Sequence, residues 1–142
     1  MVRIGVVLPA TFKDAGEVLA DVRALEAAGA DMLLLDGDGP DRLAILGAIA
    51  LATERIKLRI SEVDPVATLR RLSGGRATSE HEPGERWVEA DVPPHREGWA
   101  ALLREKEEAG VTGIVVRWDP RLIDLLRNPE PDDRSDLLMS TG

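Results

Sequence analysis

Two short segments of this 142-residue sequence carry side chains that could bind a ligand. Asp36 and Asp38 flank a glycine after a predicted strand, so their carboxylates could hold a cation or a ligand hydroxyl group. The alternative, which we favour, is a plain turn in which Asp41 caps the next helix. The segment 73–76 (Ser-Gly-Gly-Arg) could cradle a phosphate, because glycine-rich turns direct backbone N–H groups at an anion and the arginine adds positive charge.

The two histidines, His81 and His95, both fall in polar segments. We predict exposed loop residues and not general bases, because neither segment reads as a helix that would hold a carboxylate against the histidine. Trp118 follows a predicted strand and could stack on a ligand ring, although packing under the last helix is the favoured alternative. No nucleophile elbow, phosphate-binding loop or metal-ligand spacing is present. Cysteine is absent, which excludes thiolate catalysis and cysteine-bound metals.

The composition is that of an ordinary globular domain, with 44% hydrophobic and 31% charged residues. The net charge of −8 repels phosphate backbones and anionic membranes, so we expect no nucleic-acid partner and no membrane partner. No apolar run approaches about 18 residues, and the first residues lack the long apolar core of a signal peptide. We therefore expect a cytoplasmic protein.

Strand-like and helix-like patterns alternate along the chain, which is typical of a parallel sheet. Apolar runs and two-residue alternation predict strands at 3–8, 32–35, 56–60, 86–92 and 113–117. Helical spacing of apolar residues predicts helices at 14–28, 41–53, 65–72, 96–109 and 121–127. The polar, turn-rich segment 77–85 predicts a loop. We expect one α/β domain over residues 1–127 and an extended or mobile tail over 128–142.

Two longer stretches carry a family resemblance. The first is Leu-Ala-Thr-Glu-Arg-Ile-Lys-Leu-Arg-Ile at 51–60, followed by Asp-Pro at 64–65 and Leu-Ser-Gly-Gly-Arg at 72–76. The second is Val-Pro-Pro at 92–94 with Glu-Glu-Ala-Gly-Val-Thr-Gly-Ile-Val-Val at 107–116. Together they resemble luciferase-like monooxygenases, a superfamily of flavin- or deazaflavin-dependent (β/α)₈ barrels. The resemblance implies that the 73–76 turn is mainly structural and, in the family, leads into a fourth strand.

The resemblance conflicts with the length of the chain, because such a barrel needs about 250 residues. We therefore predict a truncated, barrel-like α/β fold that keeps the first three and the last two βα units. With the last strand beside the first, as in a closed barrel, this gives an open, five-stranded, mostly parallel sheet in the order 3-2-1-5-4. Alternating residues predict the 56–60 and 86–92 strands as its edges, and the strand after the 73–76 turn is expected to be missing.

A barrel fragment has its helices on the outside, so the inner face of the sheet needs a cover. The right-handed crossover rule favours the 65–72 helix as that cover, and a second copy of the chain is the other solution. The helix at 41–53 is apolar on nearly every side, which predicts burial or an interface. The resemblance implies dimer contacts in the same region, so we expect a two-fold homodimer.

The resemblance also implies where a cofactor would bind. In luciferase-like proteins it lies at the carboxyl ends of the strands, where the general rule for parallel sheets also places ligand sites. FMN or a deazaflavin is implied, with its phosphate toward one of two arginines. The Ile60–Ser61 bond matches a cis peptide that is common in the family. The candidate cofactor-binding residues at the matching positions are Pro9, Asp36, Ser61, Arg96, Arg117 and Trp118.

Two features oppose tight flavin binding. Pro93 and Pro94 lack N–H donors where such barrels bind phosphate, and the Asp36 and Asp38 carboxylates would repel a phosphate. We expect an affinity no better than about micromolar. One interpretation is a luciferase-like oxidoreductase of unknown substrate and catalytic residues, with a reductase or a full-length homologue as partner. The alternative is a non-catalytic scaffold or partner-binding protein derived from that fold.

Overall fold

The computed structural model describes residues 1–9, 12–38, 41–61 and 63–128. This part of the chain forms an α/β fold with six strands and five helices. The strands are β1 (Arg3–Pro9), β2 (Met32–Asp36), β3 (Lys57–Arg59), β4 (Ala77–Thr78), β5 (Trp87–Glu89) and β6 (Gly113–Arg117). The helices are α1 (Ala15–Ala28), α2 (Arg42–Ala52), α3 (Val66–Leu72), α4 (Arg96–Glu108) and α5 (Leu122–Arg127).

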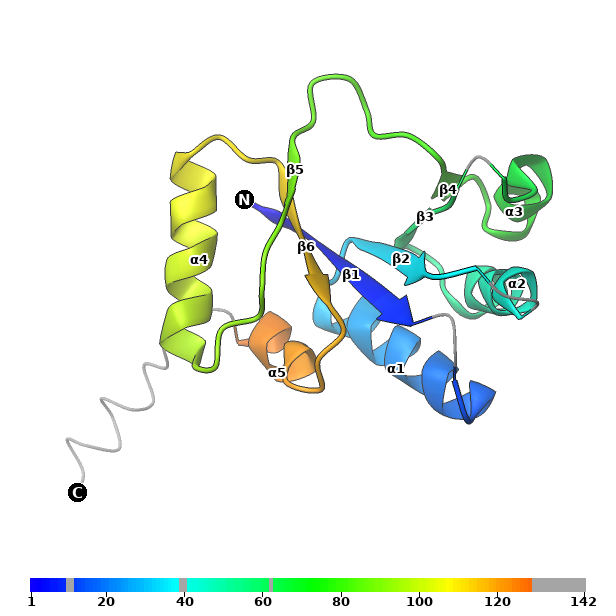
Figure 1. Cartoon of the computed structure of the whole chain (residues 1–142), viewed down its shortest axis with the longest axis horizontal. Helices are drawn as coiled ribbons and strands as arrows, with labels where there is room; N and C mark the ends of the chain where they lie inside the picture. Colours follow the sequence, from blue (N-terminus) through cyan, green and yellow to red (C-terminus); the bar gives the residue numbers. More distant parts are fainter. Residues whose placement is uncertain (10–11, 39–40, 62, 129–142) are drawn as a thin grey trace.

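The strands form one open sheet in the order β4-β3-β2-β1-β6-β5, and every neighbouring pair is parallel. Strands β1 to β4 lie side by side in chain order, β5 lies beside β6, and the last strand, β6, pairs with the first, β1 (Figure 1). The one interruption falls between β4 and β5, which form the two edges. The α/β class predicted from the sequence is therefore confirmed.

The predicted five-stranded sheet is wrong in one respect that changes an edge. β4 follows directly after the Ser-Gly-Gly-Arg turn and pairs with β3, so the 57–59 strand lies between two others. The Leu58 N–H donates to the Arg76 carbonyl at 3.2 Å and the Ile60 N–H donates to the Thr78 carbonyl at 2.9 Å. The strand that we expected to be missing is present. The segment 77–85 predicts a loop, because the two residues of β4 are too few to show the alternation of apolar and polar residues that is typical of a strand.

All five helices pack against one face of the sheet. Residues of β1, β2, β3 and β6 that point to this face share a single core with residues from each helix. Leu69 of α3 is fully buried in that core, so the prediction that the 65–72 helix covers the opposite, inner face is wrong. The core residues contributed by the helices include Val22, Leu25, Ile45, Ile49, Leu69, Trp99, Leu122 and Leu125.

The inner face is crossed by the connection between the two edge strands. We call residues 79–86 the strap. It arches from β4 to β5 over the face of the sheet that lies opposite α1, α2 and α5 (Figure 1). A crossover from one edge to the other has to pass one face, and the helices already fill the outer one.

Two predicted helix signals have opposite outcomes. Gly29 ends α1 in the left-handed conformation, with φ of 106°, as glycine at that position predicts. Asp41 was predicted to cap α2, but its side chain makes no capping hydrogen bond. The predicted tail lies outside the described residues from 129 onward. Among the described helices, none is long and apolar enough to cross a membrane.

Candidate functional site

The residues behind the family resemblance form a structural clasp between α2 and β3. The Arg76 guanidinium donates to the carbonyls of Ala50, Thr53, Ile56 and Ser73 at 2.7–2.9 Å and to the Thr53 hydroxyl at 2.8 Å. All three of its nitrogens are therefore engaged by the protein itself. This supports the structural interpretation of the 73–76 turn over phosphate binding.

A carboxylate from α1 completes this clasp, which we define as Glu26, Thr53 and Arg76. Glu26 accepts hydrogen bonds from the backbone N–H groups of Glu54, Arg55 and Ile56 at 2.7–3.2 Å. Burial alone would raise the pKa of Glu26, but these three N–H groups and the charge of Arg55 outweigh it and lower the pKa. The Thr53–Ile56 part of the conspicuous 51–60 sequence thus has a structural role, which is to fix the start of β3.

Some candidate cofactor residues do meet at the carboxyl edge of the sheet. Pro9 and Asp36 are register partners on β1 and β2. Arg117 of β6 reaches across β1 and donates to the Asp36 carboxylate at 3.1 Å. Both side chains of this pair are exposed, by 80% and 56% respectively, so the pair is worth little in stability. Trp118 is half-buried against the core, which fits the predicted packing role.

The other two candidates are engaged elsewhere. The backbone N–H of Ser61 donates to Asp64, whose carboxylate also accepts two hydrogen bonds from Arg42 at 2.9–3.1 Å. These bonds from Arg42 lower the pKa of Asp64, although burial opposes them. Arg96 is held by the Asp124 carboxylate and by the Asn128 carbonyl, which ties α4 to α5. Among the described peptide bonds, Ile60–Ser61 included, none is cis.

The space at the carboxyl edge is small and acidic. A pocket of about 260 Å³ lies on the inner face between β1, β5 and β6. Its polar lining consists of Glu89 and Asp91 besides Arg117. Pockets that enclose small molecules typically measure about 300–1,000 Å³, so a flavin would not be enclosed here.

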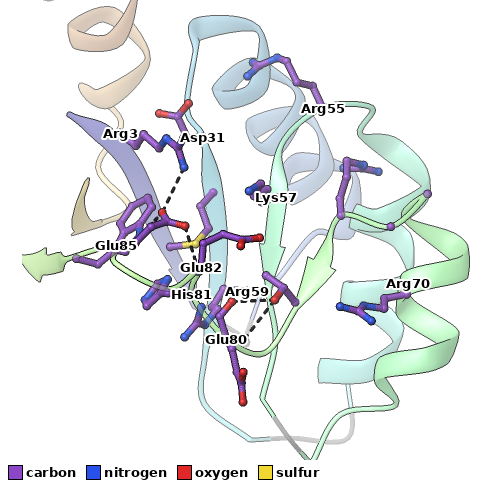
Figure 2. A pocket seen from close by; sticks show the side chains of 16 residues that line it. Arg3, Asp31, Arg55, Lys57, Arg59, Arg70, Glu80, His81, Glu82 and Glu85 are labelled. Carbon is purple, nitrogen blue, oxygen red and sulfur yellow. Dashed lines mark hydrogen bonds and ion pairs between the residues drawn. The ribbon is translucent and has the colours of Figure 1, made fainter. Parts of the chain in front are cut away.

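A larger pocket, of about 460 Å³, lies between the inner face and the strap (Figure 2). It is bounded by β1, β2 and β3 on one side and by the strap on the other. No residue pattern in the sequence predicted this pocket. Its charged lining residues are Arg3, Asp31, Arg55, Lys57, Arg59, Arg70, Arg76, Glu80, Glu82 and Glu85.

Trp87 and Glu85 anchor the strap above this pocket. A methyl group built on Gly113 would lie 2.4 Å from the Trp87 ring, so any side chain at this position would displace the ring. His81 stacks on the same ring, with centroids 5.4 Å apart and an interplanar angle of 10°. Glu85 accepts hydrogen bonds from Trp87 Nε1 at 3.1 Å and from Arg3 at 3.2 Å.

His81 and His95 are both exposed, as predicted, but His81 has a structural partner. Partial burial of the imidazole and then the nearby positive charge of Arg59 lower the pKa of His81, while the charge of Glu85 acts in the opposite direction. A histidine with a lowered pKa is mostly neutral at pH 7. As the pH falls below the ordinary pKa of histidine, the unfolded chain takes up the proton more readily than the folded one, so the contribution of His81 to stability decreases.

Two cations on β3 face the pocket without a carboxylate partner. Within the described residues, neither Lys57 nor Arg59 forms an ion pair. The Nη1 atom of Arg59 is buried and contacts no hydrogen-bond acceptor in that part of the chain. Burial lowers the pKa of Arg59, and the charges of Glu80 and Glu85 offset part of that effect.

The signal for these two residues was present in the sequence. Strand 56–60 alternates between apolar and basic residues, which places Lys57 and Arg59 on one face. We interpreted the alternation as an exposed edge. β4 instead pairs beside β3 and the strap passes over that face, and no sequence pattern indicated either contact.

A comparison with models of known protein families finds no match, and neither does a comparison with curated protein sequences. In the described part of the chain, no group of three His, Asp or Glu side chains could hold a metal ion.

Proposed function

We propose that this chain is a shortened relative of luciferase-like barrels that acts as a non-catalytic, partner-binding scaffold. The cyclic strand order supports the barrel relationship. If the two edge strands β4 and β5 were joined by further strands, the order β1 to β6 would close into a ring with β6 beside β1. The described helices all pack on one face of the sheet, as they do on the outside of a barrel. The strap bridges the gap between β4 and β5, where a complete barrel would continue with further strands.

The observation that carries the non-catalytic proposal is that the arginines expected to bind a flavin phosphate already pair with carboxylates of the chain. Of the two arginines that would meet a flavin phosphate, Arg96 is committed to Asp124 and Arg117 to Asp36. The adjacent pocket adds Glu89 and Asp91, which would repel a phosphate. An FMN phosphate at this edge would have to compete with a carboxylate for either arginine, and Pro93 and Pro94 offer it no backbone N–H donor.

A flavin titration tests this proposal. We expect FMN to change the tryptophan fluorescence only above about micromolar concentrations, near −8 kcal/mol of binding free energy or weaker. Riboflavin, which lacks the phosphate, is the matched ligand and should bind no more weakly than FMN. Stoichiometric FMN binding that is lost in Arg117→Ala would contradict the scaffold and place the phosphate at the carboxyl edge.

The second candidate is a luciferase-like oxidoreductase that uses FMN or a deazaflavin. It is favoured by the convergence of Pro9, Asp36 and Arg117 at one edge of the sheet. Such an enzyme would need a reductase or a full-length homologue to complete its site. The same titration should be repeated with a deazaflavin and with reduced FMN. Stoichiometric binding of either one would favour this candidate, and weak or absent binding of both would favour the scaffold.

The surface that we assign to partner binding lies on α2 and α3. Leu43 and Leu51 are 51% and 71% exposed, lie eight residues apart on one face of α2, and flank Gly47. Leu72 of α3, 39% exposed, lies next to Gly47. The three leucines of this stripe carry no charge, so a second copy docked there would bring no like charges into direct contact through them. We propose a two-fold homodimer through this stripe.

We expect light scattering to report about twice the chain mass of 15.4 kDa at micromolar concentration. Leu51→Glu should reduce the measured mass to that of one chain, because two carboxylates would meet across the two-fold axis. Ala101→Glu, an equivalent new charge on the exposed face of α4, should leave the dimer intact. A wild-type chain that is monomeric at this concentration would contradict the proposal.

A further inference from the structure

We propose that the pocket beneath the strap binds a small ligand through one oxyanion group, a phosphate or a carboxylate, held by Arg59 and Lys57. The pocket volume of about 460 Å³ lies within the usual range for small-molecule sites. This site lies away from the carboxyl edge and is independent of the scaffold proposal.

The strongest observation is the Arg59 side chain. Its Nη1 atom is buried and has no acceptor within the described residues. Buried donors in native proteins are almost always hydrogen-bonded, so the Arg59 guanidinium, which lines the pocket, has donor capacity that the described residues do not use. A guanidinium prefers an oxyanion, which accepts its parallel N–H groups.

The remaining charges leave the pocket floor positive. Arg3 is paired with Glu85, and Arg76 is satisfied by backbone carbonyls. Among the described residues, Arg70 is engaged through its Nε, which donates to the Ala77 carbonyl at 3.2 Å. Lys57 stands two residues from Arg59 on the same face of β3, and both point toward the space under the strap (Figure 2).

The strap limits what kind of anion can bind. Glu80 and Glu82 line the pocket but form no ion pair with the β3 cations in the described structure. Their carboxylates can accept hydrogen bonds from ligand hydroxyls, and they repel a second anionic group. The ligand class is therefore a hydroxylated molecule with a single oxyanion group and not a polyphosphate.

The test uses the full chain and follows backbone amide shifts by NMR during titration with inorganic phosphate, acetate and pyrophosphate. We expect saturable shifts at residues 57–59 and 78–87. Arg59→Gln should weaken binding by about tenfold or more, because charge-assisted hydrogen bonds are lost. Lys57→Gln changes an exposed residue and provides a second, well-folded variant in which binding should also weaken.

Arg104→Gln removes one exposed positive charge from α4 and is the matched control, which should bind as the wild type does. Saturation by phosphate but not acetate would identify a phosphate ligand, and the reverse would identify a carboxylate. Absence of shifts at 57–59, an equal loss in Arg104→Gln, or much tighter binding of pyrophosphate would each overturn the proposal.

Discussion

Arg76→Ala is expected to lower the free energy of unfolding by about 3 kcal/mol, since four carbonyls and one hydroxyl lose a charged donor at once. The clasp joins the end of α2 to the start of β3 and to the turn before β4. A loss of this size is a large part of a total stability of roughly 5–15 kcal/mol. Chemical denaturation followed by circular dichroism measures it.

Two variants make that result specific. Arg71→Ala removes a neighbouring arginine whose one side-chain hydrogen bond, to Thr68, is 3.5 Å long, so it should change stability by less than about 0.5 kcal/mol. Arg76→Lys keeps the charge but replaces a planar group of three nitrogens with a single ammonium, so it should recover only a small part of the loss. Equal stability of Arg76→Ala and Arg71→Ala would show that the clasp contributes nothing.

Ile49→Glu is expected to prevent folding altogether, with a loss of more than about 4 kcal/mol. Ile49 is 1% exposed and belongs to the core between α2 and the sheet. A glutamate there would bury a carboxylate without a partner. Far-ultraviolet circular dichroism and the dispersion of the NMR spectrum report whether the chain folds.

The matched control is Leu51→Glu, the same new charge two residues further along α2. Leu51 is 71% exposed, so this variant should keep the wild-type spectrum and lose only self-association. The pair separates the two roles that an all-apolar helix can have. A folded Ile49→Glu chain would show that α2 detaches from the core at little cost, and the dimer would then have to be reassigned to the inward face of that helix.

Much of the fold could be predicted from local patterns. The 113–117 strand has the predicted bounds, and the other predicted strands and helices begin or end within a few residues of the observed ones. These elements are encoded by spacings within one segment, which a sequence displays directly. β4 escaped prediction because its two residues become a strand only by pairing with β3, and that pairing is a tertiary contact.

The candidate ligand sites, too, could be predicted from the sequence only in part. The rule for parallel sheets, together with the barrel-like strand order that the resemblance implied, placed Pro9, Asp36 and Arg117 at one edge, and the structure brings them together there. It could not show that Arg96 is used by Asp124, which lies 28 residues away on another helix. Nor could it show the larger pocket, because the path of the strap depends on Trp87 fitting over Gly113.

The sequence by itself determined the α/β class, the positions of most elements and the face on which Lys57 and Arg59 lie, because each depends on the periodicity of one short segment. Only the tertiary structure decided which charges are already paired and which face a pocket. That outcome depends on contacts between residues far apart in the chain, as when Glu26 accepts from residues 54–56 and Arg59 is left with a buried nitrogen that has no acceptor in the described part.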